Sequence, residues 1–420
     1  MKPTFTRLFA GMALAGGLST LSLGAHAADL TIDCGATAND VQNCLPYAEE
    51  WAKKTGNTVK AYTAPTSSTD KLALLRQQFA AKASEIDVLS IDVVWPGVIK
   101  DHLVDLKKYS KGAESKFFPA MVANNVVGGK LLAMPWFTDA GLLFYRKDLL
   151  DKYKIATPQT WDELAAAAKK VMDGEKSSEL QGFVFQAKAY EGLTCDAIEW
   201  VYSFGGGTII DKQGNITINN AKAAKALDTA ASWIGTIAPG GVLNYAEEDA
   251  RGVFQNGKAV FMRNWPYAWN LAQDKDSVIK GKVGVAALPS GGSSKAAALG
   301  GWQLAVNKYS KNVDAAADLV MYLASADVQK KRALNGSYNP TMPDLYKDAD
   351  IVKANPFMGQ LLEVFTSAVA RPATETGLKY PQVSNAFWDA AHDVLEKKSN
   401  GTDAVKKLEA KLKTIKRDKW

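Results

Sequence analysis

Two tryptophan clusters carry the side chains that are best suited to bind a sugar. Residues 263–269 read Arg-Asn-Trp-Pro-Tyr-Ala-Trp, and residues 300–302 read Gly-Gly-Trp. A flat indole can lie on the C–H face of a pyranose while neighbouring amide, guanidinium and backbone groups bond its hydroxyls. Pro266 breaks regular structure, so the aromatics beside it lie on an irregular segment, where binding residues are common. These clusters predict the walls of a sugar pocket, and packing in a hydrophobic core is the alternative for each single tryptophan.

The first 27 residues have the pattern of a cleaved secretory signal peptide. Lys2 and Arg7 supply its basic start, residues 8–23 its apolar stretch, and Ala-His-Ala at 25–27 its cleavage site. A retained membrane anchor is the alternative, but the apolar stretch is short and is interrupted by glycine, serine and threonine. No cysteine stands at the cleavage point, which argues against a lipid-anchored mature form. We therefore expect export to the periplasm and a mature chain of residues 28–420.

The charge distribution excludes some classes of partner. The whole chain has a formal net charge of +6, and two of the positive charges lie in the signal peptide. Its densest basic stretch, residues 406–419, is interleaved with Leu408 and Leu412 at helical spacing, which is typical of a solvated helix face. A nucleic-acid interface needs more concentrated charge and a groove-reading motif, so we expect no nucleic-acid partner. We expect no cofactor and no metal, since the sequence has no Tyr/His cluster suited to iron.

The three cysteines indicate one disulfide and one free thiol. Cys34 and Cys44 lie close together near the mature N-terminus, and in an oxidising compartment we expect them to form a disulfide that closes a short loop. Their spacing differs from CxxC redox and zinc motifs. A buried, unreactive thiol is the expected state of Cys195. As a catalytic nucleophile it would need a histidine partner, and neither His102 nor His392 lies in a recognisable motif.

The mature chain is longer than one hydrophobic core usually serves, so we expect two domains. Residues 86–94 have the pattern of an apolar strand, and residues 71–79 have that of an amphipathic helix with a cap at 68–70. Another helix is predicted to begin at Thr160, which makes a capping box with Glu163. Short apolar strands alternate with amphipathic helices along most of the chain. This alternation predicts lobes of the α/β class.

Several short motifs occur in one order along the chain and together cover the whole mature sequence. They are residues 34–44, 50–56, 91–96, 134–141, 145–149 and 190–194, the two tryptophan clusters, and Arg-Pro at 371–372. Each motif alone is weak, and the ordered set is specific. On these motifs the chain resembles the extracytoplasmic solute-binding proteins of ABC importers, in the maltose-binding-like class. Within that class it is most similar to the trehalose/maltose (α-glucoside) binding proteins.

The resemblance implies a two-lobed α/β fold, the type II periplasmic-binding-protein fold, with discontinuous domains and a hinge that the chain crosses three times. The crossings are expected near residues 139–142, 296–299 and 338–343. The N-terminal lobe would comprise residues 28–139 plus 298–340, and the C-terminal lobe residues 140–297 plus 341–420. The sugar would lie in the cleft between the two lobes.

The resemblance also implies roles for charged residues near the cleft. Asp92 ends an apolar strand, the place where ligands meet the sheet in open α/β folds, and its carboxylate can accept two hydrogen bonds from sugar hydroxyls. A cap or turn role is the alternative for Asp92. Asp139 is expected to be a second carboxylate of this kind at a hinge crossing. Arg371 is expected to donate to sugar oxygens, and a salt bridge between the lobes is its alternative.

The aromatic walls and the close backbone approach come from the two tryptophan clusters. Trp265 and Trp302 are the expected stacking residues, and Tyr267 adds an edge contact and a hydroxyl. Gly301 lets the backbone come close to the ligand, so its amide can donate a hydrogen bond. The weaker members of the implied site are Asp40, Ser68, Tyr190 and Glu191. Among them, Asp40 stands where relatives often carry a glutamate, and Ser68 is equally explained as part of a helix cap.

The family implies binding rather than catalysis. A disaccharide of the trehalose or maltose type would bridge the lobes of a monomer, and the closed form would deliver it to the permease subunits in the membrane. A secreted glycosidase is the alternative from another class, because Asp92, Asp139 and Glu191 could pair as acid and nucleophile. A protein of the same fold with a monosaccharide or non-sugar ligand is the remaining alternative.

Overall fold

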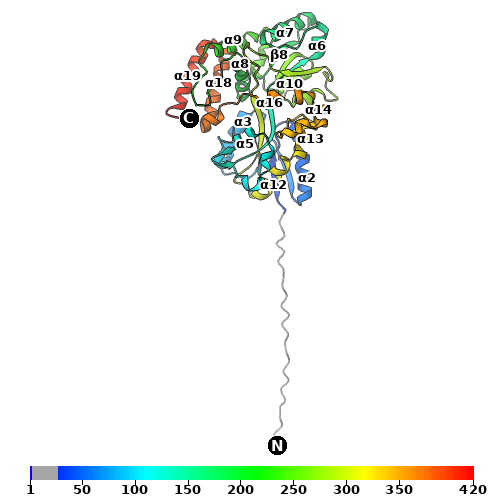
Figure 1. Cartoon of the computed structure of the whole chain (residues 1–420), viewed down its shortest axis with the longest axis vertical. Coiled ribbons are helices and arrows are strands. Elements are labelled where there is room, and N and C mark those ends of the chain that lie inside the picture. Colours follow the sequence, from blue (N-terminus) through cyan, green and yellow to red (C-terminus); the bar gives the residue numbers. More distant parts are fainter. Residues whose placement is uncertain (2–26, 361) are drawn as a thin grey trace.

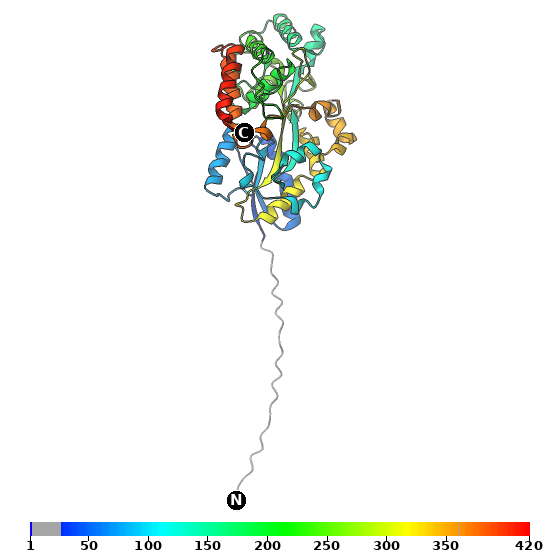
Figure 2. The ribbon, with the colours of Figure 1, turned by 60° about the vertical axis from the view of Figure 1, so that its left-hand side comes forward.

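The structure, a computed structural model, describes Met1, residues 27–360 and residues 362–420. The predicted signal peptide, residues 1–27, therefore lies almost entirely outside the described residues. The rest of the chain forms two α/β lobes, one above the other in Figure 1, and the turned view in Figure 2 shows the same arrangement. The predicted two-lobed α/β class is confirmed. In the part of the chain described here, no helix has the length and apolar character needed to cross a membrane.

Each lobe is built on one sheet. The first lobe has the strand order β2-β1-β3-β11-β6, in which β1 runs parallel to β2 and β3, and β11 lies antiparallel between β3 and β6. The second lobe has the order β10-β7-β9-β8. The first sheet comprises β1 (Asp29–Asp33), β2 (Thr58–Tyr62), β3 (Val88–Asp92), β6 (Met134–Ala140) and β11 (Leu299–Val306). The second comprises β7 (Leu142–Arg146), β8 (Gln181–Val184), β9 (Ala259–Asn264) and β10 (Val283–Ala287), and β4 (Val126–Val127) pairs with β5 (Lys130–Leu131) separately.

Helices pack on both sheets. In the first lobe α12 packs on β3, β6 and β11, and in the second lobe α7 and α10 pack on β8 and β9. The helices before β6 are α1 (Ala38–Gln42), α2 (Leu45–Thr55), α3 (Ser68–Ala80), α4 (Lys107–Ser110) and α5 (Pro119–Asn125). Between β7 and β10 lie α6 (Lys147–Tyr153), α7 (Trp161–Glu175), α8 (Glu191–Ser203), α9 (Ala221–Trp233), α10 (Glu247–Gln255) and α11 (Ala268–Ala272). After β11 come α12 (Val313–Leu323), α13 (Ala326–Gly336), α14 (Ala349–Ala354), α15 (Pro356–Gln360), α16 (Leu362–Thr366), α17 (Ala373–Thr376), α18 (Tyr380–Leu395) and α19 (Gly401–Lys416).

Local sequence signals set the starts of several elements. The capping box predicted for α7 is confirmed, because the Thr160 hydroxyl accepts a hydrogen bond from the Glu163 amide at 3.2 Å. The helix predicted at 71–79 extends from Ser68 to Ala80, and its N-cap is Ser67. The predicted strand at 86–94 is shorter in the structure, where β3 is buried along its whole length. The ends of elements thus differ by a few residues from the patterns, while their types agree.

The two sheets are connected where β6 ends and β7 begins, at Gly141. Just before β11, Ala298 pairs with Val369, and Thr138 in β6 pairs with Asn339. These contacts lie in or beside the segments predicted as hinge crossings. Helix α14 packs on α13, and α16 packs on β6, so part of the chain after residue 341 also contacts the first lobe. The predicted lobe boundaries stay a prediction.

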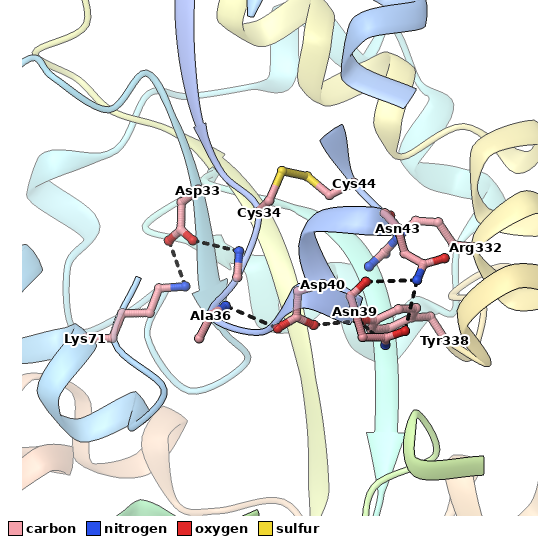
Figure 3. Close-up of a disulfide and its surroundings, with 11 residues drawn as sticks. Asp33, Cys34, Ala36, Asn39, Asp40, Asn43, Cys44, Lys71, Arg332 and Tyr338 are labelled. Atoms are coloured by element: carbon pink, nitrogen blue, oxygen red, sulfur yellow. Dashed lines mark hydrogen bonds and ion pairs between the residues drawn. A yellow bond between two sulfur atoms is a disulfide. The ribbon is translucent and has the colours of Figure 1, made fainter. Parts of the chain in front are cut away.

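A disulfide between Cys34 and Cys44 closes the loop that follows β1 (Figure 3). The loop contains α1, whose capping box joins Thr37 and Asp40. Cys195 is free and buried, and burial raises the pKa of its thiol. A thiol that stays protonated is a poor nucleophile, in agreement with the expected unreactive state.

We predict that a variant with both Cys34→Ala and Cys44→Ala has a free energy of unfolding lower by about 2–3 kcal/mol, because the disulfide restricts the unfolded chain through a short loop. Urea unfolding followed by circular dichroism measures this change. A reductant should destabilise the wild-type protein by a similar amount and leave the double variant unchanged. Equal stability of the two proteins without reductant would contradict the prediction.

Candidate functional site

A cavity of about 270 Å³ lies between the two lobes. Its walls include the loop after β1, the end of β3 and the strands β6 and β11 from the first lobe, and the starts of α8 and α10 from the second. Ten of the residues predicted from the sequence line it: Asp40, Ser68, Asp92, Asp139, Glu191, Trp265, Tyr267, Gly301, Trp302 and Arg371. The fold therefore brings together side chains that are far apart in the sequence.

Arg371 links the two lobes across the cavity wall. One guanidinium nitrogen, Nη2, lies 2.8 Å from Asp92 Oδ1 at the end of β3, and Nη1 lies 2.8 Å from Glu191 Oε1 at the start of α8. All three side chains are at most 10% exposed. The salt bridge between lobes, the alternative for this residue, is thus present in the structure. Within the described residues, Arg371 Nε is buried without a hydrogen-bond partner.

Glu191 is held from several directions. Besides the Arg371 guanidinium, the hydroxyls of Tyr380 and Ser384 donate to its carboxylate. Burial raises the pKa of Glu191, and the Arg371 charge acts in the opposite direction. Because its oxygens are already occupied by protein donors, Glu191 is suited to fixing Arg371 rather than to moving a proton.

Asp139 differs from Glu191 in the number of protein groups that bond to its carboxylate. Its side chain lines the cavity at the end of β6, and no described residue donates a hydrogen bond to it or pairs with it. Burial raises the pKa of Asp139 to about 7, although the guanidinium charges of Arg332 and Arg263 favour the ionised form. Because its side chain faces the cavity, a ligand that enters can supply the hydrogen-bond donor that the described residues do not. Asp139 is therefore the carboxylate best placed to accept a hydrogen bond from a hydroxyl in the cavity.

The two predicted stacking residues lie on the cavity wall and are half-buried. The guanidinium of Arg263 covers one face of the Trp265 ring, with Cζ 3.9 Å from the ring centroid. The Trp302 ring has the ammonium of Lys71 4.2 Å from its centroid and the edge of Trp95 at 5.5 Å between centroids. Contacts of this kind hold each ring in a fixed orientation. Each tryptophan is thus a rigid apolar wall rather than a mobile side chain.

Asp40 and Gly301 line the cavity and also stabilise the local fold. Asp40 accepts hydrogen bonds from the backbone of Ala36 and Thr37 and from the Tyr338 hydroxyl, several of which Figure 3 shows. Gly301 has a φ of +109°, and an added Cβ would lie 2.4 Å from the Phe137 carbonyl oxygen, so only glycine fits there.

Of the remaining aromatic and polar candidates, Tyr267 and Ser68 line the cavity. The Tyr267 hydroxyl donates to Glu248, and Ser68 is the first residue of α3. Tyr190 does not line the cavity. Its buried hydroxyl donates to Glu247 Oε2 at 2.6 Å, and Glu247 is the residue that reaches the wall. Tyr190 therefore supports a cavity residue from behind.

Several cavity residues were missed from the sequence. Lys71 pairs with Asp33 at 2.7 Å, as Figure 3 shows. Its ammonium also lies over the Trp302 ring. Its spacing of three from Ser68 on a helix is a signal that could have indicated a shared face. Glu247 and Glu248 follow an irregular segment and gave no such signal. The other missed residues with large side chains are Trp136, Phe137 and Tyr338.

This arrangement suits a ligand that is flat and apolar on its faces and rich in hydroxyls at its edge. Indole rings supply the apolar walls, and carboxylates and amides supply the hydrogen bonds. Among the described residues there is no group of three or more His, Cys, Asp or Glu side chains arranged to hold a metal ion.

Comparison with known proteins gives a consistent result. The family model described as bacterial extracellular solute-binding protein matches residues 44–330. A probable ABC transporter-binding protein from Deinococcus radiodurans is 57% identical over 401 residues, which cover 94% of this chain and 96% of the relative. The solved structure of maltose-bound MalE3 from T. maritima is 41% identical, with a TM-score of 0.88 over 93% of this chain and 100% of that chain.

A more distant structure shares the fold. A solute-binding protein from Thermotoga lettingae with bound alpha-D-tagatose is 24% identical, with a TM-score of 0.83 over 93% of this chain and 100% of that chain. The family match spans more than half of the chain, and the Deinococcus relative agrees with it over nearly the full length. The chain therefore belongs to the family of bacterial extracellular solute-binding proteins.

Proposed function

We propose that this chain is the periplasmic solute-binding component of an ABC sugar importer and that it binds a disaccharide of the trehalose or maltose type. The observation that carries the proposal is one cavity, walled by both lobes, that combines two fixed tryptophan rings with a carboxylate, Asp139, that has no hydrogen-bond partner among the described residues. The similar structure from T. maritima contains maltose, which supports an α-glucoside as the ligand.

The size of the cavity supports a small sugar. Its volume of about 270 Å³ lies just below the roughly 300–1,000 Å³ that is typical of ligand pockets. One or two pyranose rings match such a space better than a long oligosaccharide. By volume, a monosaccharide is a competing ligand.

The charges on the wall support a neutral ligand. Asp40, Asp92 and Glu191 already accept hydrogen bonds from protein groups, and Lys71 and Arg371 are each paired with carboxylates. A phosphorylated ligand would find no free cation among these residues and would face Asp139. Sugar hydroxyls can donate to Asp139, so a neutral polyol satisfies this wall without adding a buried charge.

The position of the cavity supports hinge closure as the mechanism. A ligand shifts an equilibrium between open and closed forms only if it makes better contacts in the closed form. Here Trp302 and Asp139 come from the first lobe, and Trp265 comes from the second, so a bound sugar would contact both. We propose that this closed form, as a monomer, is the one that the permease subunits accept.

A glycosidase is less well supported by the same geometry. Asp92 and Glu191 are both engaged by Arg371, so neither is free to act as a nucleophile or acid. Of the three carboxylates considered for catalysis this leaves Asp139, and such enzymes use a pair. We therefore propose binding without hydrolysis, and incubation with maltose or trehalose should release no glucose.

We predict that Trp265→Ala and Trp302→Ala each weaken the binding of maltose or trehalose by at least about tenfold, or about 1.4 kcal/mol, because each removes an apolar wall. Isothermal titration calorimetry measures the change. Trp420→Ala is a matched control, because this indole donates to the Gly214 carbonyl near the C-terminus and does not line the cavity. Near wild-type affinity in both cavity variants would remove the stacking role.

We predict that sugar affinity falls as the pH falls through about 7. A hydroxyl that donates to Asp139 favours its ionised form, so the ligand competes with the proton that occupies this carboxyl below its pKa of about 7. Calorimetry should show affinity roughly tenfold weaker near pH 5.5 than near pH 8.

The other charges that act on Asp139 belong to Arg332, Arg263, Asp40 and Asp92. Asp139→Asn is therefore the control, since it removes the titrating group and leaves these four in place. The variant should bind with an affinity that changes little over the same range. An equal pH dependence in wild type and variant would show that another group is responsible.

A further inference from the structure

Behind the cavity wall, Trp265 rests on a buried ion-pair cluster. Arg263, two residues earlier on β9, is 1% exposed, and its guanidinium lies over the Trp265 ring, with Cζ 3.9 Å from the ring centroid. On its far edge the same ring meets Gly300, where an added Cβ would lie 2.9 Å from Trp265 Cζ3. The indole is thus held by Arg263 on one face, by the backbone of β11 at its edge, and by a hydrogen bond from its Nε1 to Glu247 Oε1 at 3.4 Å.

Glu199 holds Arg263 in place. Its two oxygens accept from Arg263 Nε at 2.9 Å and Nη2 at 2.6 Å, a bidentate arrangement that fixes the plane of the guanidinium. The Glu199 side chain is fully buried in α8. Because Arg263 has a flat face against the indole, a shift of Glu199 would tilt the ring that faces the cavity.

Glu199 also touches two of the connections between the lobes. Its Oε1 accepts a hydrogen bond from the Ala298 amide at 2.9 Å, just before β11. An added Cβ on Gly141, between β6 and β7, would lie 2.0 Å from the same oxygen and 2.6 Å from Arg263 Nη2. One carboxylate therefore contacts both interlobe connections and the group that supports Trp265.

The neighbouring acid lacks these contacts. Asp196 pairs with Arg263 Nε at 3.0 Å and accepts from the Gln186 amide at 2.9 Å. No hydrogen bond joins the Asp196 side chain to the described residues of either connection. The two buried acids thus bind the same arginine, and only Glu199 reaches the hinge.

We propose that Glu199 is a positioning residue for sugar binding. It fixes Arg263, and through Arg263 the orientation of Trp265, relative to the two hinge connections at Gly141 and Ala298. The inference rests on the proposed function, in which Trp265 stacks on the sugar. Movement at the hinge and the orientation of the stacking ring are then coupled through one carboxylate.

A double-mutant cycle tests this coupling, with the affinity for maltose measured by calorimetry on Glu199→Gln, Trp265→Ala and the combined variant. Glutamine keeps the size of the side chain and an acceptor for Ala298, but it replaces one oxygen that Arg263 uses. We expect Glu199→Gln to weaken binding by about tenfold and to add less than about twofold when Trp265 is already alanine. The fitted stoichiometry separates lost affinity from a lost fraction of folded protein.

Asp196→Asn and Gly97→Ala are the controls, and Gly141→Ala is a second test variant. Asp196→Asn removes a neighbouring charge from the same arginine and should lower the thermal midpoint while changing affinity much less than Glu199→Gln. Gly141→Ala displaces the Glu199–Arg263 pair without removing either charge, and it carries the test if Glu199→Gln does not fold. Gly97→Ala is the matched glycine change, because no atom lies within 4 Å of its added Cβ.

The outcomes are separable. Additive losses of affinity in Glu199→Gln and Trp265→Ala, or equal losses in the Glu199 and Asp196 variants, would overturn the positioning role and leave a structural one. Wild-type affinity in Gly141→Ala would also overturn it. Absence of sugar binding by the wild-type protein would instead reject the proposed function on which the inference rests. No effect of Trp265→Ala would remove the stacking role of this ring and overturn the inference, while sugar binding by the wild type would still support the proposed function.

Discussion

The arrangement of the two lobes depends on one buried cation held between two carboxylates. Arg371 contacts Asp92 at the end of a strand in the first lobe and Glu191 at the start of a helix in the second. Removing these charges from water is costly, and only close, well-oriented pairing offsets that cost. The pairing is available when the lobes lie near each other, as they do in the structure. The cavity, its two tryptophan walls and the Asp139 carboxylate all lie around this bridge.

Some features of the fold were predictable because they are local. The capping box at Thr160 and the apolar pattern of β3 depend on residues close together in sequence, and both occur in the structure. The tryptophans show the limit of such patterns. Trp161 and Trp200 are buried in an aromatic cluster of the second lobe, whereas Trp265 and Trp302 line the cavity, and composition alone does not separate the two groups. That distinction was predicted from the residues beside these two rings, Pro266 and the glycines before Trp302, and the resemblance to a known family agreed with it.

The candidate site was predictable to the extent that its residues lie in recognisable motifs. Lys71, Glu247 and Glu248 were missed because their positions depend on how α3 and α10 pack against the opposite wall, which no short motif records. Tyr190 was predicted to contact the ligand. In the structure its hydroxyl donates to Glu247, and Tyr190 does not line the cavity. Arg371 was assigned both as a ligand donor and as a salt bridge, and only the structure shows that its terminal nitrogens are engaged by carboxylates.

The central claim is that a sugar occupies this cavity between the lobes. The most direct measurement is a crystal structure of the protein grown with maltose. The account predicts a disaccharide enclosed by both lobes, with a ring against the free face of Trp265 or against Trp302 and a hydroxyl within hydrogen-bond distance of an Asp139 oxygen. A saturated protein whose maltose lies outside this cavity, or contacts only one lobe, would contradict it.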